Sequence, residues 1–422
     1  AATVTVVDAD LNTDSSIIEV YTGNSDGTDR AGTELFRVTC NDGDCASDDP
    51  GTIKLVEDGV DSDTFIGVFT VPDNLGQDME IDYSDSRDGA GTAVNWFATA
   101  TISSSTGTVS LDRQVYPVPF TENELKEGDN TNLQYYSGDG STTAGTVTVT
   151  VAVSDPDFTD DQLKATTAPG TVNLITSGTT TAIYTFGANT ASGTELGPMT
   201  EVEQGSNVYE ISFTVAETQS SHQVLGGKTV IQVKYADSAG DTGLATNAFD
   251  SSTFDLRNGE LSADKSVYIM GQDMVITLTD EDLNLDSATA ETYALNLLEW
   301  DSSASSSQLM DGTTSSDFTA NPTKLEETGD STGVFQTVIT IPTSVNSTAL
   351  ELGEEITITY RDAGRAGEQS VAPSSSDTVS SDVELAIAIS NFGASISLDK
   401  TVYDWTDTVN IEVVAPDHNK NS

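Results

Sequence analysis

Hydrophobic and polar residues alternate in short runs along most of the chain. The clearest runs are TVTVTVAV (Thr146–Val153), TVIQVKY (Thr229–Tyr235) and EITITY (Glu355–Tyr360). A period of two is typical of strands that bury one face, so the pattern predicts an almost entirely β chain. A helical pattern occurs only at Glu122–Asp129 and Thr289–Trp300, and the second stretch alternates in YALNLLEW, so it equally predicts a strand.

Four sequence features recur in a fixed order. They are a short strand with a Tyr, a strand that ends in an acidic turn, an acidic link into a strand with Phe, and a strand that closes in Tyr, Asp and Gly. The copies of the first, third and fourth features are Ser110–Val118, Ser262–Met270 and Ser397–Trp405; Lys54–Pro72, Thr200–Ala216 and Lys324–Pro342; and Met79–Gly91, Val230–Gly243 and Ile356–Glu368. Such repetition predicts tandem copies of one structural unit.

The acidic turn is the most distinctive feature, and its fullest copy is MVITLTDEDLNLD (Met274–Asp286). A strand there leads into oxygen-bearing side chains at every second position. The candidate ligand residues of the four copies are Asp280, Asp282, Asn284 and Asp286; Asp8, Asp10, Asn12 and Asp14; Asp155, Asp157 and Asp160; and Asp417 and Asn419.

Successive acidic turns begin at Asp8, Asp155, Asp280 and Asp417, so they are 147, 125 and 137 residues apart. These spacings fit one sandwich domain each. We therefore predict tandem immunoglobulin-like, Greek-key β-sandwich domains. The predicted domains are 1–108, which lacks its first strand, 109–258 and 259–394, and residues 395–422 start a fourth repeat or are exchanged strands.

The two ends are out of phase with the repeat, and two explanations compete. In the first, the chain is a window of a longer array of the same domains. In the second, terminal strands of one chain complete the first domain of the next, as in donor-strand addition. The final segment carries an acidic-turn strand as well as a Tyr strand, which argues against a simple exchange.

Composition restricts the partners. Asp and Glu number 68 against 16 Lys and Arg, which gives a formal charge of -52. This charge excludes nucleic acid and anionic lipid surfaces as broad partners and favours cations, cationic partners or a high-salt habitat. The chain has no apolar run long enough to span a bilayer. It also has no initiating Met or signal-peptide pattern, so we expect a mature form or an excerpt.

Two short motifs favour an extracytoplasmic location. Cys40 and Cys45, the only cysteines, lie in CNDGDC, a loop short enough to bring the two sulfur atoms together. We predict a disulfide between them, which requires an oxidising compartment. Asn346, followed by Ser347 and Thr348, forms a glycosylation sequon, which supports the same location weakly.

No pattern in the sequence indicates catalysis. The two histidines, His222 and His418, lie outside any recognisable catalytic motif. Paired carboxylates could hydrolyse glycosides, but among 68 acidic residues some pair falls at any chosen spacing. We therefore expect no enzymatic activity.

The acidic turns are candidate Ca²⁺ sites, because carboxylate and amide oxygens are the ligands that Ca²⁺ prefers. The third copy is the strongest candidate, although it is not an EF-hand loop, since Leu285 and Thr292 stand at the positions of its Gly and Glu. Acidic residues of the fourth feature would complete the ligands: Asp85, Asp88, Asp237, Asp241 and Asp362. The alternative is a turn whose Asp and Asn side chains cap backbone N–H groups.

The Tyr strands carry a second recurring set of residues. Tyr116, Tyr268 and Tyr403 occupy one repeat position, and we expect core tyrosines with hydroxyls tied to the backbone. A basic residue precedes each of them by three positions, and it should neutralise a local acidic neighbour. These residues are Arg113, Lys265 and Lys400.

The ordered repeats resemble the surface-layer (S-layer) proteins of ammonia-oxidising archaea of the Nitrosopumilus-like group. The segments closest to that family are SLDKTVYDWTDTVNI, TDEDLNLD, DSTGVFQTVITIP and ITYRDAG, and the resemblance covers essentially the whole chain. The second repeat departs from the pattern, with DPDFTDD and NVYEISFTVA, which puts its turn chemistry in doubt.

The resemblance implies a long extracellular chain of immunoglobulin-like domains that assembles with copies of itself into a lattice around the cell. It also implies an acidic sheath that small ions such as ammonium can cross. An adhesin or surface filament built of the same domains is the first alternative. A set of accessory modules of a secreted enzyme is the second.

Overall fold

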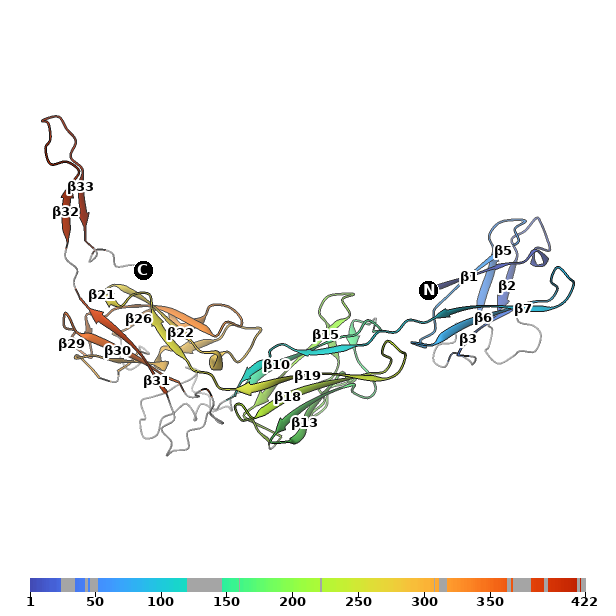
Figure 1. The fold of residues 1–422 in the computed structure, drawn as a ribbon, viewed down its shortest axis with the longest axis horizontal. Helices are drawn as coiled ribbons and strands as arrows, with labels where there is room; N and C mark the ends of the chain where they lie inside the picture. Colours follow the sequence, from blue (N-terminus) through green and yellow to red (C-terminus); the bar gives the residue numbers. More distant parts are fainter. Residues whose placement is uncertain are drawn as a thin grey trace.

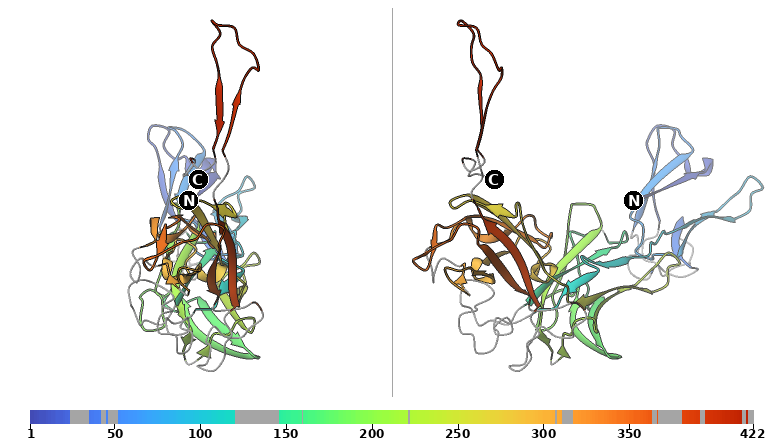
Figure 2. Two further views of the ribbon diagram at one scale, coloured as in Figure 1. Left: turned by 90° about the vertical axis from the view of Figure 1, so that its left-hand side faces the viewer. Right: turned by 60° about the vertical axis from the view of Figure 1, so that its left-hand side comes forward.

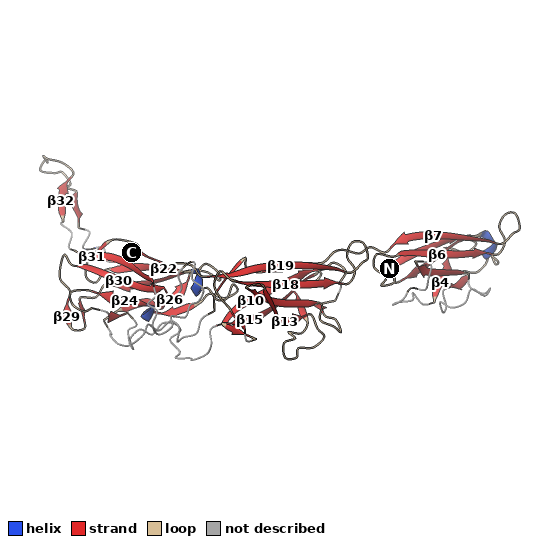
Figure 3. Cartoon of the chain, turned by 60° about the horizontal axis from the view of Figure 1, so that its bottom comes forward, coloured by secondary structure: helices blue, strands red, loops and turns tan. Residues whose placement is uncertain are grey.

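The computed structural model describes residues 1–23, 35–41, 45, 52–119, 146–158, 160–220, 222–306, 308–310, 317–362, 366, 381–390, 394–415 and 418. Three β-sheet bodies follow one another in a row, and a two-stranded hairpin projects from the third (Figures 1 and 3). Within the described residues the only helices are three single 3₁₀ turns: η1 (Ala9–Leu11), η2 (Glu281–Leu283) and η3 (Leu295–Leu297).

The first body, domain 1, consists of a four-stranded and a three-stranded sheet, ordered β1-β5-β4-β2 and β3-β6-β7. Its strands are β1 (Ala2–Val7), β2 (Val20–Gly23), β3 (Phe36–Cys40), β4 (Ile53–Glu57), β5 (Thr64–Phe69), β6 (Asp78–Asp85) and β7 (Val94–Thr101). Strand β1 lies at the edge of its sheet and pairs antiparallel with β5.

The second body, domain 2, consists of two five-stranded sheets, ordered β8-β10-β15-β14-β11 and β9-β19-β18-β12-β13. Its strands are β8 (Thr108–Leu111), β9 (Val115–Pro117), β10 (Thr146–Ser154), β11 (Gln162–Leu163), β12 (Gly170–Thr176), β13 (Thr179–Phe186), β14 (Met199–Glu201), β15 (Val208–Ala216), β18 (Thr229–Asp237) and β19 (Thr246–Asp255), with a side hairpin of β16 (Thr218–Gln219) and β17 (His222–Gln223). The first strand is split: β8 joins one sheet, and β9 pairs parallel with β19 in the other.

The third body, domain 3, repeats this topology, with sheets ordered β20-β22-β27-β26-β23 and β21-β31-β30-β24-β25. Its strands are β20 (Glu260–Ala263), β21 (Val267–Tyr268), β22 (Asp273–Thr279), β23 (Thr292–Ala294), β24 (Leu298–Asp301), β25 (Gln308–Leu309), β26 (Thr319–Glu327), β27 (Val334–Thr340), β30 (Glu355–Asp362) and β31 (Ser381–Ile389), with a side hairpin of β28 (Ser344–Val345) and β29 (Thr348–Ala349). Two packed antiparallel sheets with a split first strand form the immunoglobulin-like sandwich.

Alternation along the strands builds the core of each sandwich. In β10 the four valines at positions 147, 149, 151 and 153 are fully buried, while the residues between them are half-buried on the opposite face. Burial of each such side chain contributes about 1.5–3 kcal/mol relative to its exposure in water. The all-β, immunoglobulin-like prediction is therefore confirmed.

The two stretches with a helical pattern have different outcomes. Glu122–Asp129 lies outside the described residues. Thr289–Trp300 forms β23, η3 and β24, so the strand alternative holds over half of it and a single 3₁₀ turn separates the two strands. The reason is burial: Leu298 and Trp300 are fully buried on β24, where they pair with Tyr360 and Ile358 of β30.

Beyond domain 3, β32 (Ser395–Leu398) and β33 (Ile411–Val414) form the projecting hairpin, and every residue of both strands is exposed. The hairpin stands apart from the three bodies in each view (Figure 2). An isolated two-stranded hairpin is marginally stable in water. Strands β32 and β33 stand at the repeat positions of β20 and β22 and pair in the same register, and whether they start a fourth repeat or are exchanged strands stays a prediction.

The remaining local motifs lie at the surface or in domain 1. Cys40 and Cys45 are joined as a disulfide, with Cα atoms 4.9 Å apart. Asn346 is exposed in the tight turn between β28 and β29. In the described part of the chain, no helix has the length and apolarity that a membrane crossing requires.

Candidate functional site: acidic turns at the domain joints

The acidic turns of the three domains each begin with an Asp that follows a strand and caps its own turn, whereas Asp417 and Asn419 of the fourth copy lie outside the described residues. The carboxylates of Asp8 and Asp280 accept the N–H groups of Asp10 and Asp282, at 2.8 Å in both cases. Asp155 accepts the N–H of Asp157 at 3.0 Å in the same way. A short side chain that competes with the backbone for N–H groups explains why the strand stops there, and in domains 1 and 3 a 3₁₀ turn follows.

The second oxygen of the same Asp binds a tyrosine from the fourth repeated feature. The Tyr235 hydroxyl donates to Asp155 Oδ2 at 2.6 Å, and the Tyr360 hydroxyl donates to Asp280 Oδ2 at 2.6 Å. In domain 1 the Tyr83 hydroxyl donates to Asp8 Oδ2. The acidic turn follows a strand of one sheet, and the Tyr-Asp-Gly strand belongs to the opposite sheet. The two therefore form one site in each of the three domains.

Two further carboxylates bind the linker that enters the domain. At the joint of domains 1 and 2, Ser105 N donates to Asp157 at 2.9 Å and Gly107 N donates to Asp237 Oδ2 at 2.9 Å. The carboxylate oxygen atoms thus accept hydrogen bonds from linker N–H groups that are not paired with a neighbouring strand. The two carboxylates hold the linker immediately before β8 begins at Thr108.

The joint of domains 2 and 3 repeats this arrangement. Arg257 N donates to Asp282 Oδ2 at 2.8 Å, and Gly259 N donates to Asp362 Oδ2 at 2.8 Å. Asp282 Oδ1 accepts no hydrogen bond and lies 3.5 Å from Arg257 Nε, in an ion pair. The two hydrogen bonds hold the linker, and they are strongest when the carboxyl groups are ionised, because a charged acceptor binds a donor more strongly than a neutral one.

Glycine is required at one linker position because a tyrosine ring lies directly against it. A Cβ atom on Gly107 would come within 2.7 Å of Tyr235 Cε1, and one on Gly259 would come within 2.7 Å of Tyr360 Cε1. Contacts this short force the ring or the linker to move. The glycine therefore lets the linker lie between the tyrosine and the carboxylates.

Side chains of the Tyr strand add a second contact between domains 2 and 3. The Arg113 guanidinium donates to Asn284 O at 2.6 Å and to Asn284 Oδ1 at 3.0 Å. Ser287 Oγ donates to Asp112 Oδ2 at 2.6 Å, and Thr148 N donates to Leu285 O at 2.9 Å. The acidic turn of domain 3 is therefore part of the interface with domain 2.

Domains 1 and 2 approach each other through two glycines. Gly76 and Gly243 both have φ +71°, and a Cβ on Gly76 would come within 2.1 Å of Gly243 Cα. Ser104 Oγ donates to Gly240 O at 2.7 Å beside them. Backbone at this distance leaves no room for any side chain, so the joint is close-packed.

The joint of domains 2 and 3 holds more negative than positive charge. Burial, and then the neighbouring Asp362 carboxylate, raise the pKa of Asp280 to about 7. Burial, and then the Asp280 carboxylate, raise the pKa of Asp282 to about 8. Burial likewise raises the pKa of Asp157 at the other joint. A proton or a cation at these carboxylates would relieve the repulsion.

The structure separates the four candidate ligands of the third repeat. Asp280 and Asp282 face the tyrosine and the linker, Asn284 faces Arg113, and Asp286 caps the N–H of Ala288 at 3.0 Å. In domain 1, Asn12 donates to Asp61 at 3.2 Å and Asp14 caps Ser16. Within the described ranges, no group of three or more His, Cys, Asp or Glu side chains could hold a metal ion. The Ca²⁺ site stays a prediction, and the alternative of capping turns accounts for the contacts seen.

The recurring Tyr-strand tyrosines bind carboxylates as well as the backbone. The hydroxyls of Tyr116, Tyr268 and Tyr403 donate to Asp112, Asp264 and Asp399, at 2.5, 2.7 and 2.5 Å. The hydroxyls of Tyr268 and Tyr403 also accept the N–H of the residue after that Asp. The basic residues pair with acidic ones as expected: Arg113 with Asp112, Lys265 with Asp264, and Lys400 with Asp407.

A contact between the buried Glu327 and the half-buried Glu291 was not recognised in the sequence. Glu327 accepts the N–H groups of Thr332 at 2.6 Å and Gly333 at 2.8 Å, and Glu291 N donates to it at 3.2 Å. Burial, and then the hydrogen bond with Glu327, raise the pKa of Glu291 to about 8. Glu57 and Glu201 stand at the position of Glu327 in the other domains, since each pairs with the aromatic residue eight positions later. This recurrence in the third feature was the available signal.

Comparisons with known proteins give only distant likenesses. No protein-family model matches the chain, and no curated protein matches it. Among solved structures, the Escherichia coli adhesin FdeC aligns with a TM-score of 0.21 at 12% identity, over 88% of this chain and 85% of that one.

The Yersinia pseudotuberculosis adhesin InvE aligns with a TM-score of 0.19 at 12% identity, over 66% of this chain and 58% of that one. Domains 1–6 of the surface layer protein SbsC align with a TM-score of 0.18 at 8% identity, over 90% of this chain and 58% of that one. The chain therefore spans less than two thirds of the InvE and SbsC structures.

Proposed function

We propose that this chain is a structural, non-catalytic protein of the cell surface, whose copies assemble into an S-layer lattice. The observation that carries the proposal is the pair of joints, at which carboxylates of one domain bind the N–H groups of the linker that enters it. An array whose linkers are hydrogen-bonded at both joints is stiff, which a tiled coat requires. The resemblance of the repeats to archaeal S-layer proteins supports the same role.

The charge of the chain suits an outer coat that small cations cross. A dense array of units that each carry -52 raises the local concentration of positive ions. The reach of this potential is about 8 Å at physiological ionic strength and is shorter in more concentrated salt. The potential would therefore extend across narrow pores only. We propose that ions such as ammonium pass through pores of that kind.

Divalent cations are proposed as partners of the acidic turns. If Ca²⁺ or a similar ion neutralises the raised-pKa carboxylates, its removal should lower the melting temperature and loosen the assembly. For a contribution of about 1–2 kcal/mol per site, a domain of this size should melt about 3–8 °C lower.

The measurement is calorimetry in low-sodium buffer, with EDTA and then with excess Ca²⁺. An equal concentration of Mg²⁺ separates a specific Ca²⁺ effect from general screening. An unchanged melting temperature and assembly in EDTA would show that divalent ions are not structural in this protein.

A surface filament or adhesin is the second candidate. The three bodies lie end to end in a row, and head-to-tail contacts between copies would extend that row in one direction (Figure 1). Such contacts form open fibres or closed rings unless lateral contacts add a second direction. Imaging of the assembled chain distinguishes the two candidates.

A further inference from the structure

One sheet of domain 1 exposes a row of apolar side chains on its outer face. Strands β2, β4, β5 and β1 lie side by side in that order, and one residue from each belongs to the row. Val20 and Val56 are 52% and 41% exposed, and Val68, two residues beyond the row on β5, is 63% exposed. The apolar row consists of Val20, Val56, Ile66 and, at its end, Thr5, each of which pairs with the next.

The equivalent rows of domains 2 and 3 are polar at their centre. Glu326 of domain 3 stands at the position of Val56, and Glu210 of domain 2 stands at the position of Ile66. The sheet therefore forms with charged residues on this face, so folding does not require the apolar row. Contiguous exposed apolar side chains mark interaction sites on protein surfaces. The equivalent rows are Gln162, Thr200, Glu210 and Ala152 in domain 2 and Thr292, Glu326, Gln336 and Thr277 in domain 3.

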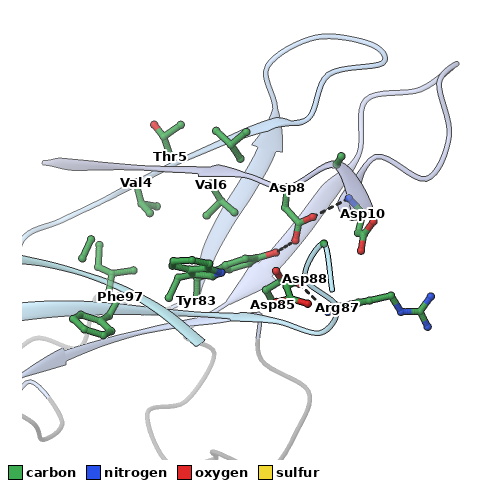
Figure 4. Close-up of a pocket in the computed structure, with 16 residues that line it drawn as sticks. Val4, Thr5, Val6, Asp8, Asp10, Tyr83, Asp85, Arg87, Asp88 and Phe97 are labelled. Carbon is green, nitrogen blue, oxygen red and sulfur yellow. Dashed lines mark hydrogen bonds between the residues drawn. The ribbon is translucent and has the colours of Figure 1, made fainter. Parts of the chain in front are cut away.

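The apolar row points away from the core of domain 1. On β1, Val4 and Val6 point into the sandwich, and Thr5 points the opposite way (Figure 4). In domains 2 and 3 a further strand extends the sheet beside β10 or β22, where it lies at the edge and to the side of this face. Strands β6 and β7 run along the row of domains, and the two sheets of a sandwich are roughly aligned, so the face lies on the flank of the molecule (Figure 3).

Charged residues on β4 determine which partner fits this face. Lys54, Val56 and Asp58 follow one another at every second position, and all three are exposed. Asp58 N donates to Thr64 O at 2.8 Å, so the pairing with β5 continues past the end of β4 at Glu57. Lys54 and Asp58 therefore lie on the same face, one on each side of the apolar row. A two-fold axis beside Val56 and perpendicular to β4 brings Lys54 of each copy to Asp58 of the other.

We propose that two copies of this chain bind each other through the apolar row of domain 1, face to face about this two-fold axis. The contact rests on the proposed self-assembly and names one interface of it. Chains that each carry -52 repel one another, so they approach most easily where apolar side chains and opposite charges meet. Burial of the valines of both copies removes apolar surface from water. Because the face lies on the flank of the molecule, the contact joins neighbouring rows of domains side by side.

The first test gives domain 1 the residue that domain 3 has at the centre of its row. Because domain 3 folds with Glu326 on this face, Val56→Glu should keep the melting temperature of the wild type. Association of the full chain is measured by analytical ultracentrifugation in about 0.5 M salt, where repulsion between distant charges is screened. Val56→Glu should weaken association by at least about tenfold, because two carboxylates would meet at the axis. The matched control, Thr200→Glu, adds the same charge at the equivalent position of domain 2 and should leave association nearly unchanged.

The second test exchanges the two charges on β4. Lys54→Asp and Asp58→Lys should each weaken association about threefold or more, because like charges then face each other twice in the dimer. Asp58→Lys is the sharper of the two, since it lowers the overall negative charge and would strengthen an association limited by general repulsion. The double variant Lys54→Asp with Asp58→Lys restores both pairs and should restore association. Weakening without this restoration overturns the two-fold arrangement.

The third test uses the symmetry directly, since a residue on a two-fold axis meets its own copy. Cys40 and Cys45 are bonded to each other, and the described residues contain no free cysteine, so Val56→Cys introduces a single thiol. Disulfides join packed sheets in antibody domains, so mild oxidation should link two Val56→Cys chains. Thr200→Cys is the control and should stay unlinked. Equal linking of both variants, or of neither, overturns the proposal.

The outcomes separate this contact from the proposed lattice. Equal association of the Val56→Glu and Thr200→Glu chains overturns the contact, even if the wild type still forms ordered sheets. A wild type that stays monomeric under these conditions assigns the apolar row to a different partner, which also overturns the contact. A linked Val56→Cys dimer without sheets leaves the contact standing and removes the lattice.

Discussion

Replacement of Arg257 by Ala should destabilise the joint of domains 2 and 3 by about 2–3 kcal/mol at pH 8.5, because it leaves the buried, ionised Asp282 without its cation. Arg257 Nε lies 3.5 Å from Asp282 Oδ1, and its Nη1 lies 3.5 Å from Glu281. The Asp282 side chain is 8% exposed, so water cannot replace the lost charge. The Arg257 side chain is 31% exposed, which keeps the expected loss below that of a fully buried pair.

Chemical denaturation followed by tryptophan fluorescence measures this effect, because Trp300 is fully buried in domain 3. Arg87→Ala is the matched control, since Arg87 is an exposed arginine beside the acidic turn of domain 1. Equal stability of the Arg257→Ala chain and the wild type would mean that the guanidinium does not offset the negative charge of Glu281 and Asp282.

The stability of domain 3 should decrease as the pH rises from about 4 to about 8. Asp280 and Asp282 have pKa values of about 7 and about 8 in the folded chain, well above those of unfolded aspartate. The folded state therefore binds more protons than the unfolded state across this window, and each rise in pH costs stability. Above about pH 9 both carboxyl groups are ionised in the folded and the unfolded state, and the dependence ends.

We expect domain 3 to melt about 5 °C or more higher at pH 5 than at pH 8.5. Asp282→Asn should flatten this dependence, because the amide keeps the acceptor oxygen and cannot ionise. Asp286→Asn removes one charge from the same turn outside the cluster and should leave the slope in place. A melting temperature that rises with pH over this window in the wild type would contradict the pKa values and the burial that causes them.

The two predictions are linked through Asp282. At pH 5 its carboxyl group is protonated, so the loss of Arg257 should matter less there than at pH 8.5. A bound divalent cation would have the opposite consequence, since it would hold the carboxylates ionised and suppress the dependence on pH. Measurements with and without EDTA at both pH values therefore report on protons and metal ions separately.

Much of the fold could be predicted from the sequence because two-residue alternation marks strands directly. The runs at Thr146–Val153 and Glu355–Tyr360 became β10 and β30 with small shifts at their ends. Thr289–Trp300 was ambiguous because η3 interrupts its alternation. The decisive fact, the burial of Trp300 against Phe318, is a tertiary contact that local pattern does not contain.

The candidate site was predicted in part. Alternate acidic residues at a strand end marked the turns correctly as special positions. Their main contacts, however, are with Tyr360, which lies 80 residues from Asp280, and with the linker at Arg257 and Gly259. Which backbone N–H groups would meet which carboxylates depends on how neighbouring domains pack, and a repeat pattern shows only that the same partners recur.

The two joints follow one principle of assembly. Within the chain, a linker and first strand bind the acidic site of the domain that they enter. The acidic residues then have two roles: they bind backbone N–H donors at each joint, and they give the assembled surface its negative charge.

Electron microscopy of the full chain, assembled in about 0.5 M salt with Ca²⁺, tests the proposed function most directly, since salt at this level screens the repulsion between copies. The account predicts flat sheets with in-plane symmetry, in which rows of domains lie end to end. Helical fibres would favour the filament, and particles that remain solitary monomers under these conditions would contradict self-assembly into a surface coat.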